Sequence, residues 1–242
     1  MVQKHSIILW RKAEKADKNF EEISKDAFSV LSIFQDYPHD LRPNYLTSKT
    51  VENIKQFNWN YENFSRILKE GSNREDEKIF EDLGYSVSFY SAVNALNSCG
   101  FQMRVGNKND RFNNVLIIDL PLSLNLYDKE IADMIKNLFI KLVLAYVPYW
   151  GCVSNKALSR KYGTYLEGNL PTTVHWMNYW SEDIARAVGI ERLKKLVDEN
   201  PEISYKKGIL LTKDTGYDMD KAEDVRFHEK IQKSLFTDAL QL

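Results

Sequence analysis

Residue types that could carry covalent or metal chemistry are few in this chain and far apart. The nearest two of its four histidines, His5 and His39, are 34 residues apart, and neither Cys99 nor Cys152 belongs to a CxxC pair. Zinc and iron sites usually draw on His and Cys ligands at short, regular spacing. The sequence therefore predicts no metal site.

A nucleophilic site would need Cys152, in the run WGCVSN, to be activated by His175. A thiol becomes a nucleophile only beside a base or cation that lowers its pKa. The sequence positions of Cys152 and His175 do not show that the two side chains lie together. A small buried thiol beside a strand explains Cys152 better, and we expect both cysteines to be reduced and buried. No GxSxG, GxGxxG or GxxxxGK[ST] motif occurs. We predict no catalytic residues, no cofactor and no enzymatic activity.

The run LPTTVHWMNYW, residues 170–180, concentrates aromatic side chains without catalytic groups. Val174 and Trp176 alternate with His175 and Met177, which is typical of a strand, and core packing explains Trp176. Tyr179 and Trp180 are adjacent and therefore point to different sides, so at least one ring is expected at the surface. Exposed Tyr and Trp often anchor protein interfaces. Buried structure and partner binding both remain open for this run.

Hydrophobic periodicity supplies the elements that would position these residues. Period-two or continuous apolar runs predict strands at 6–10, 87–89, 101–105, 115–120, 149–154, 174–177 and 208–213. Helical spacing predicts helices at 20–34, 49–57, 61–70, 128–147, 182–188, from 190 to before Pro201, and 225–235, with an exposed loop at 158–169. We predict one α+β domain, 1–242, whose mainly antiparallel central sheet of about five to six strands is flanked by helices.

Composition argues against partners that are recognised by bulk charge. The 242 residues include 33 basic and 34 acidic ones, and a net charge of -1 gives no field that attracts nucleic acid or an anionic membrane. The apolar segment 134–147 contains Lys136, Asn137 and Lys141. It falls short of the roughly 18 apolar residues that span a bilayer. The N-terminus lacks the apolar core of a signal peptide, so we expect a cytoplasmic protein.

One acidic cluster allows two interpretations. Five carboxylates occur between residues 75 and 82, namely Glu75, Asp76, Glu77, Glu81 and Asp82. We interpret this stretch as a solvated helical face. The alternative is a strip that occupies the cationic cleft of a protein acting on nucleic acid, by placing carboxylates where phosphates would bind.

The order of several motifs resembles that of a bacterial immunity family. These motifs are the strand ending in Trp10, the runs 83–89 and 115–121, the turn 149–151, and the segment 175–179. Their layout is similar to that of the immunity protein 52 family, whose late tryptophan-x-x-tyrosine element corresponds to Trp176 and Tyr179. This chain departs from the family pattern in having His175, not glycine, before Trp176, and in an inserted region, 36–82.

The resemblance implies a cytoplasmic α+β protein that binds a specific toxin, blocks its active site and has no catalysis of its own. Such inhibition needs a preorganised surface built around a few aromatic or arginine anchors. The candidate partner-binding residues are Trp150, Trp176, Tyr179, Trp180, Arg42 and Tyr45. The sequence leaves the oligomeric state open.

Two other functions compete with toxin binding. One is an enzyme that processes a small molecule in a site assembled from distant residues. The other is a nucleic-acid-binding protein, for which Lys156, Arg160 and Lys161 are the compact basic candidate. We favour toxin binding and predict no nucleic-acid or membrane partner.

Overall fold

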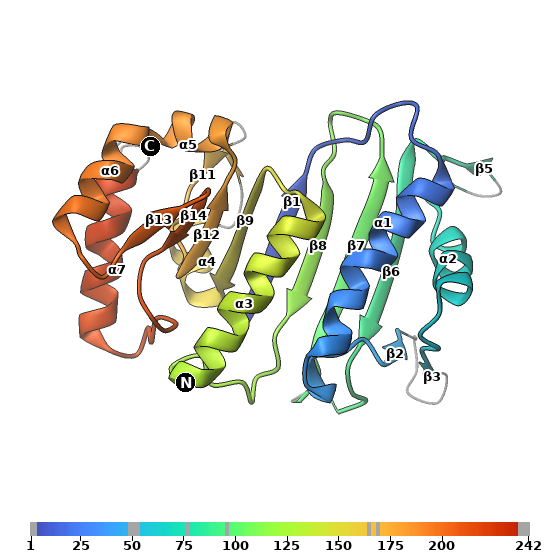
Figure 1. The fold of residues 1–242 in the computed structure, drawn as a ribbon, viewed down its shortest axis with the longest axis horizontal. Helices are drawn as coiled ribbons and strands as arrows, with labels where there is room; N and C mark the ends of the chain where they lie inside the picture. The colour runs from blue at the N-terminus through green and yellow to red at the C-terminus, as the bar shows by residue number, and fades with distance from the viewer. Residues whose placement is uncertain are drawn as a thin grey trace. The chain divides into compact units, whose positions relative to one another are not determined.

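A computed structural model describes residues 4–47, 54–75, 78–94, 97–163, 166–167 and 170–236. Its main sheet has ten strands in the order β13-β14-β12-β9-β1-β8-β7-β6-β2-β3 (Figure 1). Their bounds are β1 His5–Arg11, β2 Tyr45–Leu46, β3 Lys55–Gln56, β6 Leu83–Tyr90, β7 Gly100–Asn107, β8 Asn114–Asp119, β9 Trp150–Asn155, β12 Met177–Trp180, β13 Ser204–Lys206 and β14 Ile209–Leu211. Two small hairpins stand apart, β4 Arg74–Glu75 with β5 Lys78–Ile79, and β10 Leu166–Glu167 with β11 Leu170–Pro171.

The helices alternate with these strands in an α+β arrangement. They are α1 Phe20–Ser32, α2 Tyr61–Glu70, α3 Lys129–Tyr146, α4 Lys156–Tyr162, α5 Glu182–Val188, α6 Ile190–Glu199 and α7 Ala222–Leu235, with two short 3-10 turns, η1 Ile33–Asp36 and η2 His39–Leu41. Strand pairs β6–β7, β7–β8, β9–β12 and β12–β14 are all antiparallel. The predicted class and the mainly antiparallel sheet are confirmed. In the described part of the chain no helix has the length and apolarity needed to cross a membrane.

The predicted count of about five to six strands is wrong, because the sheet has ten. The main-sheet strands that were missed are β2 and β3, with two residues each, and β13, with three, whereas β14 falls within the strand predicted at 208–213. Alternation over so few residues gives no periodic signal, since a period of two needs four or more residues to stand out. These strands exist because neighbouring strands supply hydrogen-bond partners.

Four further predictions about local structure were wrong. The strand predicted at 174–177 lies three residues later, as β12, and residues 174–176 are in no strand. The predicted helix 49–57 is replaced, in its described part, by β3, while 49–53 lie outside the described residues. The predicted loop 158–169 begins as helix α4, capped by Asn155, whose side chain accepts a hydrogen bond from Ala157 N at 2.8 Å. The acidic stretch predicted as a helical face contains the β4–β5 hairpin, with Asp76 and Glu77 outside the described residues.

The chain divides into two compact units. Unit 1 comprises 1–6, 124–140 and 149–242, and unit 2 comprises 7–123 and 141–148. Neither unit is one continuous piece of chain. Two of the four divisions between the units fall within regular elements, one within β1 and one within α3. Whether the chain behaves as one domain stays a prediction.

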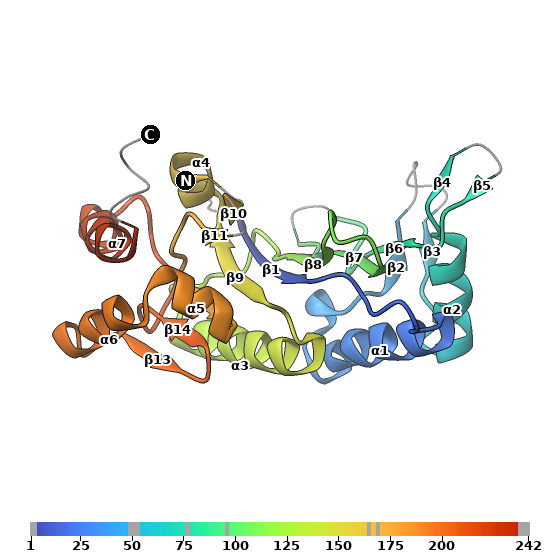
Figure 2. The same ribbon diagram turned by 90° about the horizontal axis from the view of Figure 1, so that it is seen from above.

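Helices cover one face of the sheet in unit 2. Helix α1 begins at a capping box in which Asn19 Oδ1 accepts from Glu22 N at 3.0 Å and Glu22 Oε2 accepts from Asn19 N at 2.9 Å. Helices α1 and α2 both lie on the same side of β6, β7 and β8 (Figure 2). Ring contacts such as Phe34–Phe101, with centroids 5.0 Å apart, fill this layer. Its sheet residues, Tyr85, Val87, Phe89, Phe101, Met103, Val105, Leu116 and Ile118, are all at most 6% exposed.

Unit 1 is built around the strand order β13-β14-β12-β9. β12 lies between β9 and β14, so Asn178 pairs with Cys152 on one side and with Leu210 on the other. Helix α7 contributes buried His228, whose Nε2 lies 2.8 Å from the Val174 carbonyl oxygen. Buried Tyr217 donates to Thr212 Oγ1 at 2.7 Å. His228 and Tyr217 are thus each tied to this core by a hydrogen bond.

Candidate interaction surface

Among the described residues of unit 2, no helix lies on the second face of the β6–β7–β8 sheet (Figure 2). Strand alternation directs eight side chains to it, which we call the open face: Ser86, Ser88, Tyr90, Gln102, Arg104, Val115, Ile117 and Asp119. Each is exposed or half-buried, whereas the residues between them in sequence are buried beneath the helices. These residues are therefore accessible in unit 2, although they belong to its central strands.

The strand register arranges the open face in rows. Ser86, Arg104 and Val115 form one row, and Ser88, Gln102 and Ile117 form the next. In a third row Tyr90 pairs with Gly100, and its ring leans over the glycine, with Cε1 3.9 Å from where a Cβ would stand. Tyr45 pairs with Tyr90 across β2 and β6 and so faces the same side. Asp119 pairs with Gly100 in the same row. The face thus has tyrosines and a carboxylate at one end and an arginine toward the other.

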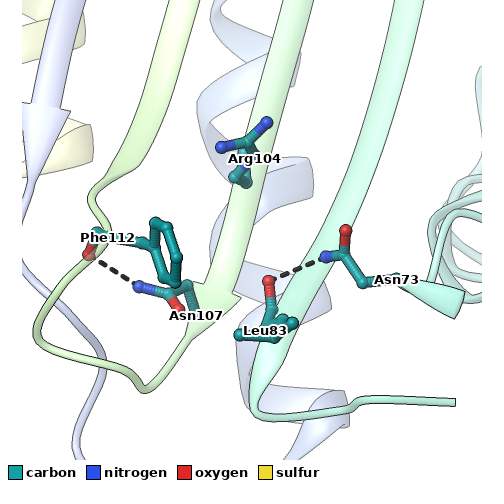
Figure 3. A pocket seen from close by; sticks show the side chains of 5 residues that line it. All are labelled: Asn73, Leu83, Arg104, Asn107 and Phe112. Atoms are coloured by element: carbon teal, nitrogen blue, oxygen red, sulfur yellow. Dashed lines mark hydrogen bonds between the residues drawn. The ribbon is translucent and has the colours of Figure 1, made fainter. Parts of the chain in front are cut away.

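A pocket of about 160 Å³ opens beyond Arg104, lined by Asn73, Leu83, Arg104, Asn107 and Phe112. Figure 3 shows these side chains on the near side of the strands, with a helix passing behind the sheet. Ligand sites for substrates and cofactors usually enclose roughly 300–1,000 Å³, while a cavity near 150 Å³ holds a benzene ring. The pocket is therefore sized for one side chain of a partner.

Two glycines shape the strand ends beside this pocket. Gly84 has φ +74° and Gly106 has φ +75°, values that L side chains rarely adopt. A Cβ on Gly84 would lie 2.3 Å from the Val105 carbonyl oxygen and 2.5 Å from the Asn107 nitrogen. The close approach of the two strands at this point thus requires glycine.

Asparagines fix the loop that carries Phe112. Asn107 Nδ2 donates to the carbonyl oxygens of Phe112 at 2.7 Å and Asn109 at 3.0 Å (Figure 3 draws the first). Asn114 Oδ1 accepts from Asn107 N at 2.9 Å. Across the pocket, Asn73 Nδ2 donates to the carbonyl oxygens of Leu83 at 2.8 Å and Gly84 at 2.9 Å. The Phe112 side chain, 51% exposed, is thus presented by an already ordered loop.

Arg104 differs from most charged residues of the structure. Within the described residues its guanidinium makes no hydrogen bond and no ion pair, and it is the one cationic side chain of the open face, whose other charged residue is Asp119. By contrast, Arg66 pairs with Glu70 at 2.6 Å and Arg186 with Glu182 at 3.2 Å. An arginine in this setting can form two parallel hydrogen bonds with an incoming carboxylate.

A second hollow, of about 390 Å³, lies on the loop between β1 and α1. It is lined by Glu14, Lys15, Asp17, Lys18 and Glu22. Lys18 Nζ lies 2.6 Å from Asp26 and 3.3 Å from Glu14. Burial lowers the pKa of Lys18, but these two carboxylates outweigh it and the net shift is upward. Lys18 is thus already paired with carboxylates, so this hollow is the weaker candidate.

Cys99, Cys152 and His175 are all buried. Both cysteines are free and buried, as predicted, and burial raises the pKa of each thiol, so neither is a ready nucleophile. Burial, with smaller contributions from His228 and His5, lowers the pKa of His175 to about 3. Among the described residues no three His, Cys, Asp or Glu side chains gather into a metal site.

Comparison with known proteins identifies a shared fold. No protein-family model and no curated protein matches this chain. The fold is similar to that of a T6SS protein. This is the protein PA0821 of Pseudomonas aeruginosa, with a TM-score of 0.59 and 13% identity over 96% of this chain and 73% of that chain. Identity this low shows similarity of fold alone. Membership of the immunity protein 52 family stays an expectation.

Three of the six predicted anchors are core residues. Trp150 and Trp180 pair across β9 and β12 and are 2% and 1% exposed. Trp176 is also 2% exposed, and its Nε1 donates to the Lys213 carbonyl oxygen at 2.7 Å. In this structure their rings are available to a partner only if the core opens.

The other three predicted anchors keep part of their side chains accessible. Tyr179 is half-buried beside Gly208, Arg42 donates from Nε to the Tyr37 carbonyl oxygen at 2.5 Å, and Tyr45 borders the open face. Tyr179 lies in unit 1, whereas Arg42 and Tyr45 lie in unit 2.

Sequence analysis missed Arg104, Phe112 and the rest of the open face. The signal was present in the alternation of Gln102 and Arg104 with buried Phe101, Met103 and Val105. Alternation identifies the side of a strand that faces away from the core, but it does not reveal that this side stays uncovered.

Proposed function

We propose that this chain is a cytoplasmic immunity protein that binds a cognate bacterial toxin and inhibits it without catalysis of its own. The observation that carries the proposal is the fold similarity to a T6SS protein, at a TM-score of 0.59 over 96% of the chain. The order of motifs that resembles the immunity protein 52 family supports the same function. Both point toward bacterial competition.

The open face adds physical support for a binding role. Its eight residues include Tyr, Arg, Val and Ile, one Asp and no Lys or Glu. Protein interfaces are enriched in Tyr and Arg and depleted of Lys, Glu and Asp relative to the remaining surface. The small neighbouring pocket suits one inserted side chain and is smaller than the usual substrate site.

Co-expression tests this function. The toxin-like product of the gene adjacent to this one is expressed in a bacterial host, with and without this chain, and survival is counted. We expect the chain to restore survival and to copurify with the toxin. Undiminished killing, while the chain is present at full level and folded by circular dichroism, would rule out the pairing.

Stoichiometry separates inhibition by binding from an enzymatic mechanism. When the purified chain is titrated into a fixed amount of toxin, inhibition by occupancy ends at a fixed molar ratio and leaves the toxin mass unchanged. Full neutralisation by a small fraction of one equivalent, or a changed toxin mass, would instead indicate that the chain is an enzyme acting on the toxin.

A further inference from the structure

We infer that the open face is the surface that holds the toxin, with Arg104 receiving a carboxylate from an acidic segment of that protein. This inference rests on the proposed function and specifies its binding site. The expected occupant of the open face is a protein segment with an Asp or Glu side chain flanked by apolar residues.

Charge identifies the occupant. The open face carries one guanidinium, Arg104, which makes no ion pair within the described residues, and one carboxylate, Asp119, two rows away. A carboxylate from a partner would gain two charge-assisted hydrogen bonds that no described residue makes to Arg104. Nucleic acid would require several cations that neutralise successive phosphates, whereas this face supplies one.

The surroundings of Arg104 match the same occupant. Val115 lies beside it in the same row, Ile117 lies in the next row, and Phe112 stands at the pocket rim with 51% of its surface exposed. When a partner covers these apolar groups, water leaves the neighbourhood of the guanidinium. Loss of competing water strengthens an ion pair at the centre of an interface.

Preorganisation lowers the entropy lost on binding. Hydrogen bonds from asparagine side chains already hold the Phe112 loop and the opposite pocket wall. The remaining residues of the open face lie in hydrogen-bonded central strands. A surface that is ordered before contact loses less freedom when it binds, which favours tight inhibition.

The test measures binding of the purified product of the adjacent toxin-like gene to three forms of the full chain. These are the unaltered chain, Arg104→Glu and a matched control, Arg160→Glu. Arg160 is an exposed arginine of α4 in unit 1, and within the described residues it likewise has no hydrogen bond or ion pair. Circular dichroism and thermal melting check that each variant folds.

We expect Arg104→Glu to raise Kd at least 100-fold, Phe112→Ala to raise it about 10-fold, and Arg160→Glu to change it less than about twofold. Arg104→Glu should also lower neutralisation of the toxin in cells. Exchange of the contacting toxin carboxylate for Arg should restore binding to Arg104→Glu, because the ion pair is re-formed with reversed charges.

Each contrary outcome has a distinct meaning. If the unaltered chain does not bind the toxin, the proposed function fails, and this inference fails with it. If the unaltered chain binds and folded Arg104→Glu binds equally well, toxin binding stands but the open face is not the site. If light scattering shows a dimer of the unaltered chain that Arg104→Glu dissociates, the face is an interface between two copies, and the inference is overturned.

Discussion

At the scale of single residues, burial determines which chemistry is accessible. Cys152 and His175 have the types expected of a nucleophile and a base, but burial raises the pKa of the thiol and lowers that of the imidazole. Each is thereby held in its neutral form. Arg104 shows the opposite condition, since it is exposed and charged and makes no ion pair within the described residues. Arg104 thus gives the open face an accessible positive charge.

Buried His175 leads to a prediction about pH. Its pKa is about 3 in the folded chain against 6.5 for an ordinary histidine, so the unfolded chain binds the proton first as the pH falls below 6.5. The contribution of His175 is fully present above that pH and is lost progressively as the pH falls toward the folded pKa. Between pH 7 and pH 5 we expect the free energy of unfolding to fall by about 2 kcal/mol from this group.

Urea unfolding at a series of pH values measures this effect. His175→Gln should flatten the dependence between pH 7 and pH 5, even if the variant is less stable at pH 7, because the slope reports only proton uptake. Equal slopes for the two proteins would show that His175 does not titrate differently in the folded and unfolded states.

At the scale of elements, predictions held where the signals are local and failed where a partner strand decided the structure. Helix α2 was predicted at 61–70 and observed at Tyr61–Glu70, because an amphipathic pattern, the Asn60 cap and Gly71 are all local signals. Residues 54–57 carried a helical prediction but contain β3, which pairs with β2. A two-residue strand is held by its partner strand, which local sequence does not reveal.

The pair of positive-φ glycines supports a prediction about β6 and β7. Gly84→Ala should lower the free energy of unfolding by about 3 kcal/mol, because it combines a left-handed backbone with contacts to two backbone atoms. Gly100→Ala is the matched control. Its Cβ would meet nothing closer than 3.5 Å, and we expect a change within about 0.5 kcal/mol.

Denaturant titration of both variants provides the measurement. The glycine at 84 also shapes the pocket, so any folded Gly84→Ala protein should bind toxin more weakly than the unaltered chain. Similar stability of the two variants would show that the close approach at Gly84 relaxes without cost.

At the scale of the whole molecule, the chain passes repeatedly between the two compact units. Unit 2 takes residues 141–148 from the end of α3, while the rest of α3 belongs to unit 1. Strand β1 is divided in the same way. Separate domains are usually joined by exposed linkers that few contacts cross. Boundaries within regular elements therefore favour the predicted single domain.

We accordingly predict that the chain unfolds in one cooperative transition. Replacement of Trp10 and Trp59 by Phe leaves Trp150, Trp176 and Trp180, so fluorescence then reports unit 1 alone, while far-ultraviolet circular dichroism reports both units. The two signals should share one urea midpoint. Distinct midpoints would indicate two domains of different stability.

The sequence by itself determined the α+β class, most of the long helices and strands, and the burial of the two thiols, because periodicity and capping act within a few residues. Tertiary structure decided which aromatic rings are buried and which sheet face stays open in unit 2. Trp150 and Trp180 are far apart in sequence, yet they pair across adjacent strands in the core. Alternation places Arg104 on the side of its strand away from the core, but whether a helix or a carboxylate covers it depends on distant residues.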